Sequence, residues 1–238
     1  MILFVLLLWA GQGDSSKNFD MKPGSRFYLD THKGHIQVVP SKDATCHVVA
    51  RMVREPGVTY REATVQMKQF GGDVEVSVEY DDDHSGWFDD RDLVPVEFEI
   101  ALPDFVKLKI DDHKSTFDIT CPRAEVKIDT HKGEGEIRGI MAPFELDTHK
   151  GTFKIQVVSL ADFTIDTHKG DIEVTIQEAH DFSLAAESHK GDFRFKGRSV
   201  HADDDEDESY AYREGSGANR VRLSTHKGRI HLNFLDGK

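Results

Sequence analysis

A five-residue motif, Asp-Thr-His-Lys-Gly or a close variant, occurs seven times in this chain of 238 residues. The copies occupy residues 30–34, 111–115, 129–133, 147–151, 166–170, 187–191 and 224–228. From the second copy onward, successive motif histidines are 18, 18, 19, 21 and 37 residues apart. A strand-like repeat with a period near 18 predicts a solenoid in which each copy belongs to one turn.

The residues on either side of each motif alternate between apolar and polar side chains. Counted from the last residue of the motif, positions −7, −5, +2, +4 and +6 are apolar, as in Phe144, Leu146, Phe153, Ile155 and Val157. This two-residue period is typical of half-buried strands. We expect an all-β fold, a single-chain parallel β-helix or β-solenoid with about 18 residues per turn and a right-handed coil. Each turn would be two strands joined at the motif glycine, which tolerates a positive φ.

Three parts of the chain are expected. Residues 1–13 open with an apolar run that is too short to span a bilayer and is typical of a signal peptide, with a buried first strand as the alternative. Residues 14–105 would form a less regular β region continuous with the solenoid. It has strand patterns at 45–53, 73–80 and 94–101, and a strand or a short helix at 61–70. Residues 106–238 would form the repeat solenoid, with an acidic loop inserted at 199–218. A secreted, periplasmic or cell-surface location follows from the leader, and no membrane span is expected.

The formal net charge of −13 comes mainly from two acidic clusters, one within 81–92 and one at 203–208. The rest of the chain is nearly neutral, which argues against nucleic acid as a partner because phosphate binding requires a basic face. A cell-surface polymer or a protein is the expected partner, and open solenoid ends would allow self-association. Cys46 and Cys121 lie at apolar positions of the pattern, so packing thiols are expected, with a disulfide as the alternative.

The motif should place its side chains in columns along the solenoid. Residues i and i+2 of a strand share a face, so the motif Asp and His would point outward and the Thr between them inward. One interpretation is a charge-balanced, solubilising ladder. The other is an array that binds an anionic polymer, or zinc or a similar divalent metal through neutral imidazoles. The candidate residues are His32, His113, His131, His149, His168, His189, His226, Asp111, Asp129, Asp147, Asp166, Glu187, Lys114, Lys132, Lys150, Lys169, Lys190 and Lys227.

A second candidate site lies in the first acidic cluster. The spacing of oxygen ligands in residues 81–92 matches that of a calcium-binding loop, although the flanking segments have strand patterns and position 12 is Asp rather than Glu. A solvated acidic hairpin loop is the alternative. The candidate calcium ligands are Asp81, Asp83, Ser85, Trp87 through its carbonyl, Asp89 and Asp92.

Signatures of catalysis are scarce in the sequence. An active site needs one distinctive constellation of groups, whereas the acids, bases and lysines here are repeated. We therefore expect no enzymatic activity and no required cofactor. A polysaccharide-active β-helix enzyme is the least favoured alternative.

The strand–motif–strand segment Ile165-Asp-Thr-His-Lys-Gly-Asp-Ile-Glu-Val174 resembles the bacterial putative-adhesin domain family of unknown function. The resemblance covers most of residues 20–238, and it implies a single-chain parallel β-helix with an adhesin-like binding or surface role. The family more often has small polar residues where this chain has His-Lys. The expected function is an exported, non-enzymatic scaffold that binds through stacked Asp, His and Lys columns. A self-assembling structural envelope protein is the alternative.

Overall fold

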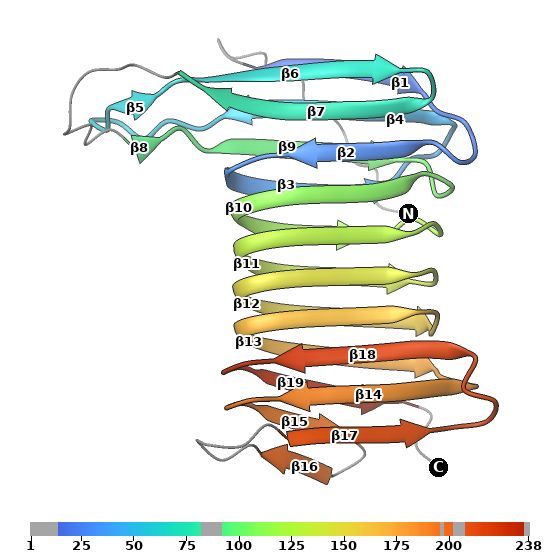
Figure 1. Cartoon of the computed structure of the whole chain (residues 1–238). Coiled ribbons are helices and arrows are strands. Elements are labelled where there is room, and N and C mark those ends of the chain that lie inside the picture. The colour runs from blue at the N-terminus through green and yellow to red at the C-terminus, as the bar shows by residue number, and fades with distance from the viewer. Residues whose placement is uncertain (1–13, 82–91, 196–197, 202–207, 236–238) are drawn as a thin grey trace.

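The computed structural model describes residues 14–81, 92–195, 198–201 and 208–235, and all the regular structure in these ranges is β. Seventeen strands form one large, mostly parallel sheet that winds into a stack of coils (Figure 1). The short strands β5 (Tyr60–Arg61) and β8 (Asp92–Leu93) pair separately at one end. The described part contains no helix capable of crossing a membrane. The prediction of an all-β fold is confirmed.

Four long strands form the middle of the stack. They are β10 (Lys107–Thr120), β11 (Val126–Ile140), β12 (Phe144–Ser159) and β13 (Phe163–Glu178). Equivalent motif residues pair in parallel from coil to coil, so that Lys150 lies beside Lys132 on one side and Lys169 on the other. Each strand continues through its motif. The expectation of two separate strands per turn is therefore wrong for these four coils, because parallel pairing is maintained through the bend. It is confirmed for the coils of residues 26–40, 182–195 and 219–234, each of which has two strands.

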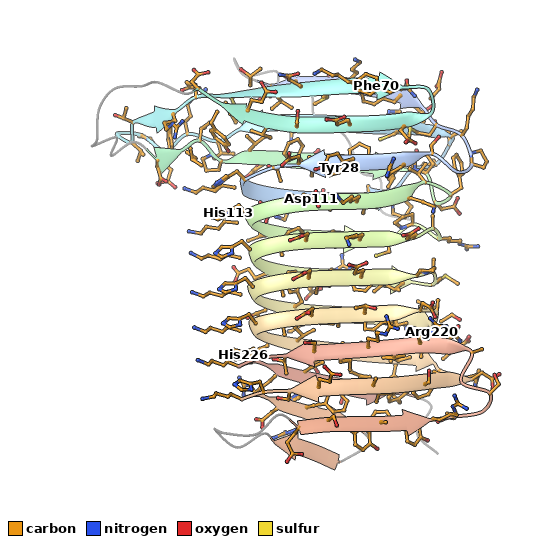
Figure 2. All side chains as sticks on the ribbon, viewed as in Figure 1. Tyr28, Phe70, Asp111, His113, Arg220 and His226 are labelled. Atoms are coloured by element: carbon orange, nitrogen blue, oxygen red, sulfur yellow. The ribbon has the colours of Figure 1, made fainter. Side chains whose placement is uncertain are left out.

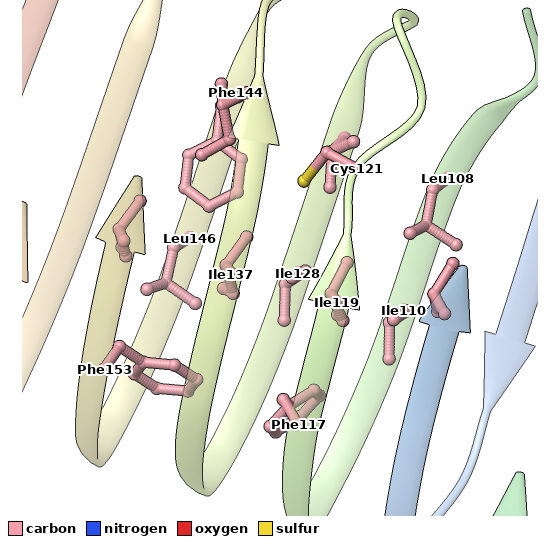
Figure 3. Packing of buried hydrophobic residues seen from close by; sticks show 14 of the residues in the cluster. Leu108, Ile110, Phe117, Ile119, Cys121, Ile128, Ile137, Phe144, Leu146 and Phe153 are labelled. Atoms are coloured by element: carbon pink, nitrogen blue, oxygen red, sulfur yellow. The ribbon is translucent and has the colours of Figure 1, made fainter. Parts of the chain in front are cut away.

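The apolar residues on both sides of the motif form the core. In the coil of β12, Phe144, Leu146, Phe153, Ile155 and Val157 are all buried. Apolar side chains from neighbouring coils fill the space between the two limbs of the bend (Figure 3). The predicted alternation of inward and outward side chains is confirmed, and burial of each large apolar side chain contributes about 1.5–3 kcal/mol.

Both cysteines belong to this core. Cys46 and Cys121 are buried and free, which confirms the prediction of packing thiols and shows that the disulfide alternative was wrong. Burial raises the pKa of each thiol to about 12, because the apolar surroundings disfavour the thiolate.

The motif glycines are needed for close packing rather than for a positive φ. Among them only Gly34 has a φ in the positive range, at 152°. A Cβ on Gly151 would lie 2.6 Å from the carbonyl oxygen of Gly133 in the next coil, and one on Gly170 would lie 2.8 Å from the carbonyl oxygen of Gly151. The expected reason for the glycine is therefore confirmed only at Gly34, and at Gly151 and Gly170 it was wrong, since a side chain is excluded there by the neighbouring backbone.

The corner of β10 has Ser115 in place of the motif glycine, and a second motif residue differs as well. Asp112 replaces the motif threonine, and the Ser115 hydroxyl donates a hydrogen bond to its carboxylate at 2.6 Å. The Ser115 amide and the Thr130 hydroxyl also donate to Asp112, at 3.0 and 2.7 Å. In an ordinary corner the Gly228 amide donates to the Thr225 hydroxyl at 2.9 Å. The Asp–Ser pair thus replaces the Thr–Gly pair as a unit.

Antiparallel strands close the N-terminal end of the stack. The strands of this end are β1 (Ser15–Asp20), β2 (Arg26–Asp30), β3 (Lys33–Pro40), β4 (Thr45–Met52), β6 (Ala63–Phe70), β7 (Asp73–Tyr80) and β9 (Val96–Leu102). The coil of β2 and β3 pairs with β10 on one side and with β7 and β9 on the other. Beyond that coil, β6 pairs antiparallel with β7, β4 with β9, and β1 with β4. Residues 63–70 thus form a strand, not the alternative helix.

The C-terminal end departs from chain order. Its strands are β14 (Phe182–Ser188), β15 (Asp192–Phe195), β16 (Arg198–His201), β17 (Glu208–Arg213), β18 (Asn219–Thr225) and β19 (Arg229–Phe234). The last coil, β18 and β19, lies between β13 and the coil of β14 and β15 (Figure 1). Successive copies of the motif therefore do not stack in chain order at this end.

The segment 199–218, expected to be an acidic loop, includes strand structure. Strand β17 pairs antiparallel with β14, and β16 pairs antiparallel with β15. Tyr210 and Tyr212 of β17 pack against Phe195 of the last core layer. The described part of this segment therefore covers the end of the apolar core, which a solvated loop would leave open.

Candidate functional site: the motif corner column

The seven motif histidines form one continuous stack. It runs along an edge of the molecule, as the labelled His113 and His226 show (Figure 2). In stacking order, the ring centroids are separated by 4.4 Å for His32–His113, 4.9 Å for His113–His131, 4.7 Å for His131–His149, 4.6 Å for His149–His168, 4.5 Å for His168–His226 and 4.5 Å for His226–His189. Five of these six pairs have ring planes within 11° of parallel. The inserted coil supplies His226, so the predicted histidines come together in an order that differs from the sequence.

The stack favours neutral imidazoles. Desolvation, followed by the charges of neighbouring histidines and lysines, lowers the pKa of His131, His149 and His168 below the ordinary value. Desolvation and the charge of His113 likewise lower the pKa of His32. The ring of Tyr80 makes an edge contact with His32, with 5.9 Å between the ring centroids. Among the described residues, no three His, Cys, Asp or Glu side chains are grouped so that they could hold a metal ion. Because neighbouring rings are nearly parallel, their equivalent nitrogens lie in a row along the stack and do not converge on a single metal position.

The motif lysines form a second column next to the histidines. The side chains of Lys114, Lys132, Lys150, Lys169 and Lys227 are exposed. Within the described ranges, none of these five ammonium groups has a carboxylate within 4 Å, whereas Lys33 pairs with Asp92 at 3.2 Å. The expectation that the acidic column would offset the lysine charges is not met by direct ion pairs.

The acidic motif residues lie on the other side of the histidines. Desolvation and then the neighbouring carboxylates Asp129 and Asp166 raise the pKa of Asp147. Asp111 has other partners, because it accepts hydrogen bonds from the Tyr28 hydroxyl at 2.7 Å and from Lys109 at 2.8 Å. The Asp column is interrupted at the inserted coil, where Ser224 pairs with Asp166 on one side and Glu187 on the other. The motif corner therefore carries a basic column and an acidic column separated by imidazoles.

A groove of about 960 Å³ follows the lysine column. Six successive coils line it, those of β3, β10, β11, β12, β13 and β19. Each contributes its motif lysine and its motif glycine or serine, and all but the coil of β19 also contribute the residue that follows. Those following residues are His35, Thr116, Glu134, Thr152 and Asp171, and Val53, Pro95 and Glu97 line the end near β9. The groove was not predicted from the sequence, although the alternation does place the residue after the glycine on the outer surface.

The predicted calcium loop is mostly outside the described residues. This applies to Asp83, Ser85, Trp87 and Asp89, which fall in residues 82–91. Asp81 is exposed at the end of β7, and Asp92 forms the ion pair with Lys33.

Comparisons with known proteins place the chain in a family. No curated protein matches the sequence. A crystal structure described as a putative cell adhesion protein from Clostridium sporogenes is 12% identical, covers 93% of this chain and 99% of its own, and gives a TM-score of 0.47. Another, described as a putative adhesin from Bacteroides fragilis, is 9% identical, covers 94% of this chain and 98% of its own, and gives a TM-score of 0.32. The Toastrack DUF4097 profile matches residues 109–233, just over half of the chain. The chain therefore belongs to the Toastrack DUF4097 family.

Proposed function

We propose that this chain is an exported, non-enzymatic scaffold, a right-handed β-solenoid that binds its partner along the motif corner column. The observation that carries the proposal is the register of the corner, where seven imidazoles stack with at most 4.9 Å between neighbouring ring centroids and lysines line up beside them. A surface that repeats in this way is complementary to a partner that also repeats. The apolar run in residues 1–13 supports export to the cell surface or beyond.

The arrangement of the corner supports binding more than catalysis. Catalysis needs a nucleophile, a base and an orienting group set apart by distinctive surroundings. Here each coil offers nearly the same His and Lys in nearly the same surroundings. The low pKa values of the central histidines extend over several coils and so do not single out one of them.

End-to-end self-assembly, the alternative structural role, has less support. The outermost strands β1 and β6 at one end and β16 and β17 at the other are antiparallel to the strands they cover. Lys17 and Lys68 lie on the two outer strands of the N-terminal end. Charged residues on an edge strand disfavour addition of another chain. We therefore expect a monomer.

The proposal is tested by binding of the fluorescently labelled full chain to intact bacterial cells from a panel of envelope types. The corner variant replaces the motif histidines and lysines of three middle coils with Ser and Gln, at His131, Lys132, His149, Lys150, His168 and Lys169. We expect the wild-type chain to be retained by at least one cell type and the corner variant to be lost. Equal retention of both proteins, or retention of neither by any cell, would contradict the proposal.

A further inference from the structure

We infer that the groove beside the lysine column binds a linear acidic polysaccharide. The inference rests on the proposed binding function and names the class of ligand. Six motif lysines line the groove, namely Lys33, Lys114, Lys132, Lys150, Lys169 and Lys227. They come from six adjacent coils, because β18 and β19 insert next to β13.

The lysine charges are available to a ligand. The five lysines from Lys114 to Lys227 are exposed, and no described carboxylate lies within 4 Å of their ammonium groups. Exposed like charges one coil apart repel each other, so an anionic chain lying along them would be stabilised by every coil it crosses. Coils follow one another at about 4.8 Å, so the six lysines extend over roughly 24 Å. The ligand is therefore an extended polymer with anionic groups repeated at a similar spacing.

The other residues that line the groove favour a sugar backbone. Thr152 presents a hydroxyl group, and the Thr116 hydroxyl shares a hydrogen bond with His35 at 2.8 Å. Glu134 and Glu97 present carboxylates, and the carboxylate of Asp171 is paired with Arg229. Carboxylates accept hydrogen bonds from hydroxyl groups, whereas they repel an anion. A ligand that fits must therefore direct its acidic groups toward the lysines and neutral donors toward the other residues. Uronic acid polymers have both groups on every sugar ring, and one sugar ring is about as long as the spacing between coils.

Single-stranded nucleic acid fits the groove less well. Proteins that bind it combine basic grooves with aromatic side chains on which the bases stack. No Phe, Tyr or Trp is among the described residues that line the groove.

The test measures binding of polygalacturonate and polymannuronate fragments of increasing length to the full chain at low ionic strength. We expect affinity to increase with fragment length up to about six sugars, the number of lysine-bearing coils, and to fall with added salt. Fully methyl-esterified polygalacturonate, which keeps the sugar and lacks the charge, should bind about tenfold more weakly or worse.

Matched variants locate the site. The triple variant Lys132→Gln, Lys150→Gln, Lys169→Gln should weaken binding about tenfold, since each exposed ion pair contributes a factor of a few. The control Lys22→Gln, Lys42→Gln, Lys154→Gln removes three exposed lysines that do not line the groove, and it should bind within about twofold of wild type. Thermal unfolding followed by circular dichroism checks that both variants are folded.

Three results would overturn the inference: equal binding by the two triple variants, no binding of either polyuronate, or binding of inorganic polyphosphate or oligo-dT as tight as that of the polyuronates. If the corner variant loses cell binding while the polyuronates fail, the proposed function stands and the ligand class is wrong. If cell binding is insensitive to the corner variant, the proposed function itself fails.

Discussion

The middle and the C-terminal end of the stack use the same motif in different ways. From β10 to β13 each coil pairs with the coil that follows it in sequence, and strands run unbroken through the corner. After β13 the chain leaves the place of one coil empty and forms β14 to β17 beyond it. Strands β18 and β19 then occupy that place, between β13 and the coil of β14 and β15. The histidine spacing is nevertheless as regular there, at 4.5 Å, as in the middle. The motif therefore determines the geometry of a coil but not its position in the stack.

The largest effect is expected from removal of the inserted coil. Deleting residues 219–238 removes Val221, Leu223, Ile230 and Leu232, all buried, and leaves β13 and β14 without the coil that joins them. Four such side chains contribute about 6–12 kcal/mol, comparable to the total stability of a typical domain. We expect urea unfolding, followed by circular dichroism, to show loss of the cooperative transition. A truncated chain that unfolds at the urea concentration of one lacking only residues 236–238 would show that the insertion is dispensable.

The next effect distinguishes packing from backbone conformation at the corner. In Gly151→Val, the new side chain would collide with the carbonyl oxygen of Gly133 and with the ring of Phe153. Overpacking of this kind costs about 1–3 kcal/mol. The control Thr152→Val lies on the neighbouring exposed position and should change the free energy of unfolding by less than about 0.5 kcal/mol. If both variants unfold at the same urea concentration, the steric explanation of the motif glycine is wrong.

A smaller effect compares the β10 corner with the ordinary corners. The single variant Ser115→Gly removes one hydrogen bond from Asp112, and Asp112→Thr replaces the carboxylate acceptor of the Ser115 hydroxyl with a neutral hydroxyl. The double variant restores the Thr–Gly corner. We expect each single change to cost about 1 kcal/mol and the double variant to cost less than their sum, with a coupling above about 0.5 kcal/mol. Additive free energies of unfolding would show that the two residues do not act as a unit.

The smallest effect is expected from pH. Because the pKa values of His131, His149 and His168 are lowered in the folded chain, the unfolded chain binds more protons near neutrality. Their contribution to stability is fully present above pH 6.5, which is the ordinary pKa of histidine, and is lost as the pH falls toward the lowered pKa values. Asp30 and Asp147 have raised pKa values and act in the opposite direction in a more acidic range.

We expect the melting temperature to fall between about pH 7.5 and pH 5.5, and to fall less in His149→Asn than in wild type. Identical slopes in wild type and His149→Asn would show that the stack does not respond to protonation in this range.

The sequence predicted much of the coil and part of the site. The alternation around Phe153 and Ile155 was sufficient to identify the inward positions, since a period of two has one consistent burial pattern. The motif repeat was sufficient to align the histidines and lysines. The role of Gly151 was not predictable, because it depends on a carbonyl oxygen of another coil. The inserted coil was not predictable either, because Val221 and Leu223 satisfy the same pattern at any position in the stack.

The groove and the binding proposal both require an uninterrupted corner column that includes the inserted coil. Cysteine pairs at the residue after the motif glycine test this order directly. Asp171 pairs with Arg229, and Arg229 pairs with Asp192, so Asp171 and Asp192 lie two coils apart, at about 9.6 Å. The variant Asp171→Cys, Arg229→Cys should form a disulfide under mild oxidation, since adjacent coils are within the 4.4–6.8 Å range of disulfide Cα separations. The variant Asp171→Cys, Asp192→Cys should not. A disulfide in the second variant and none in the first would contradict the account.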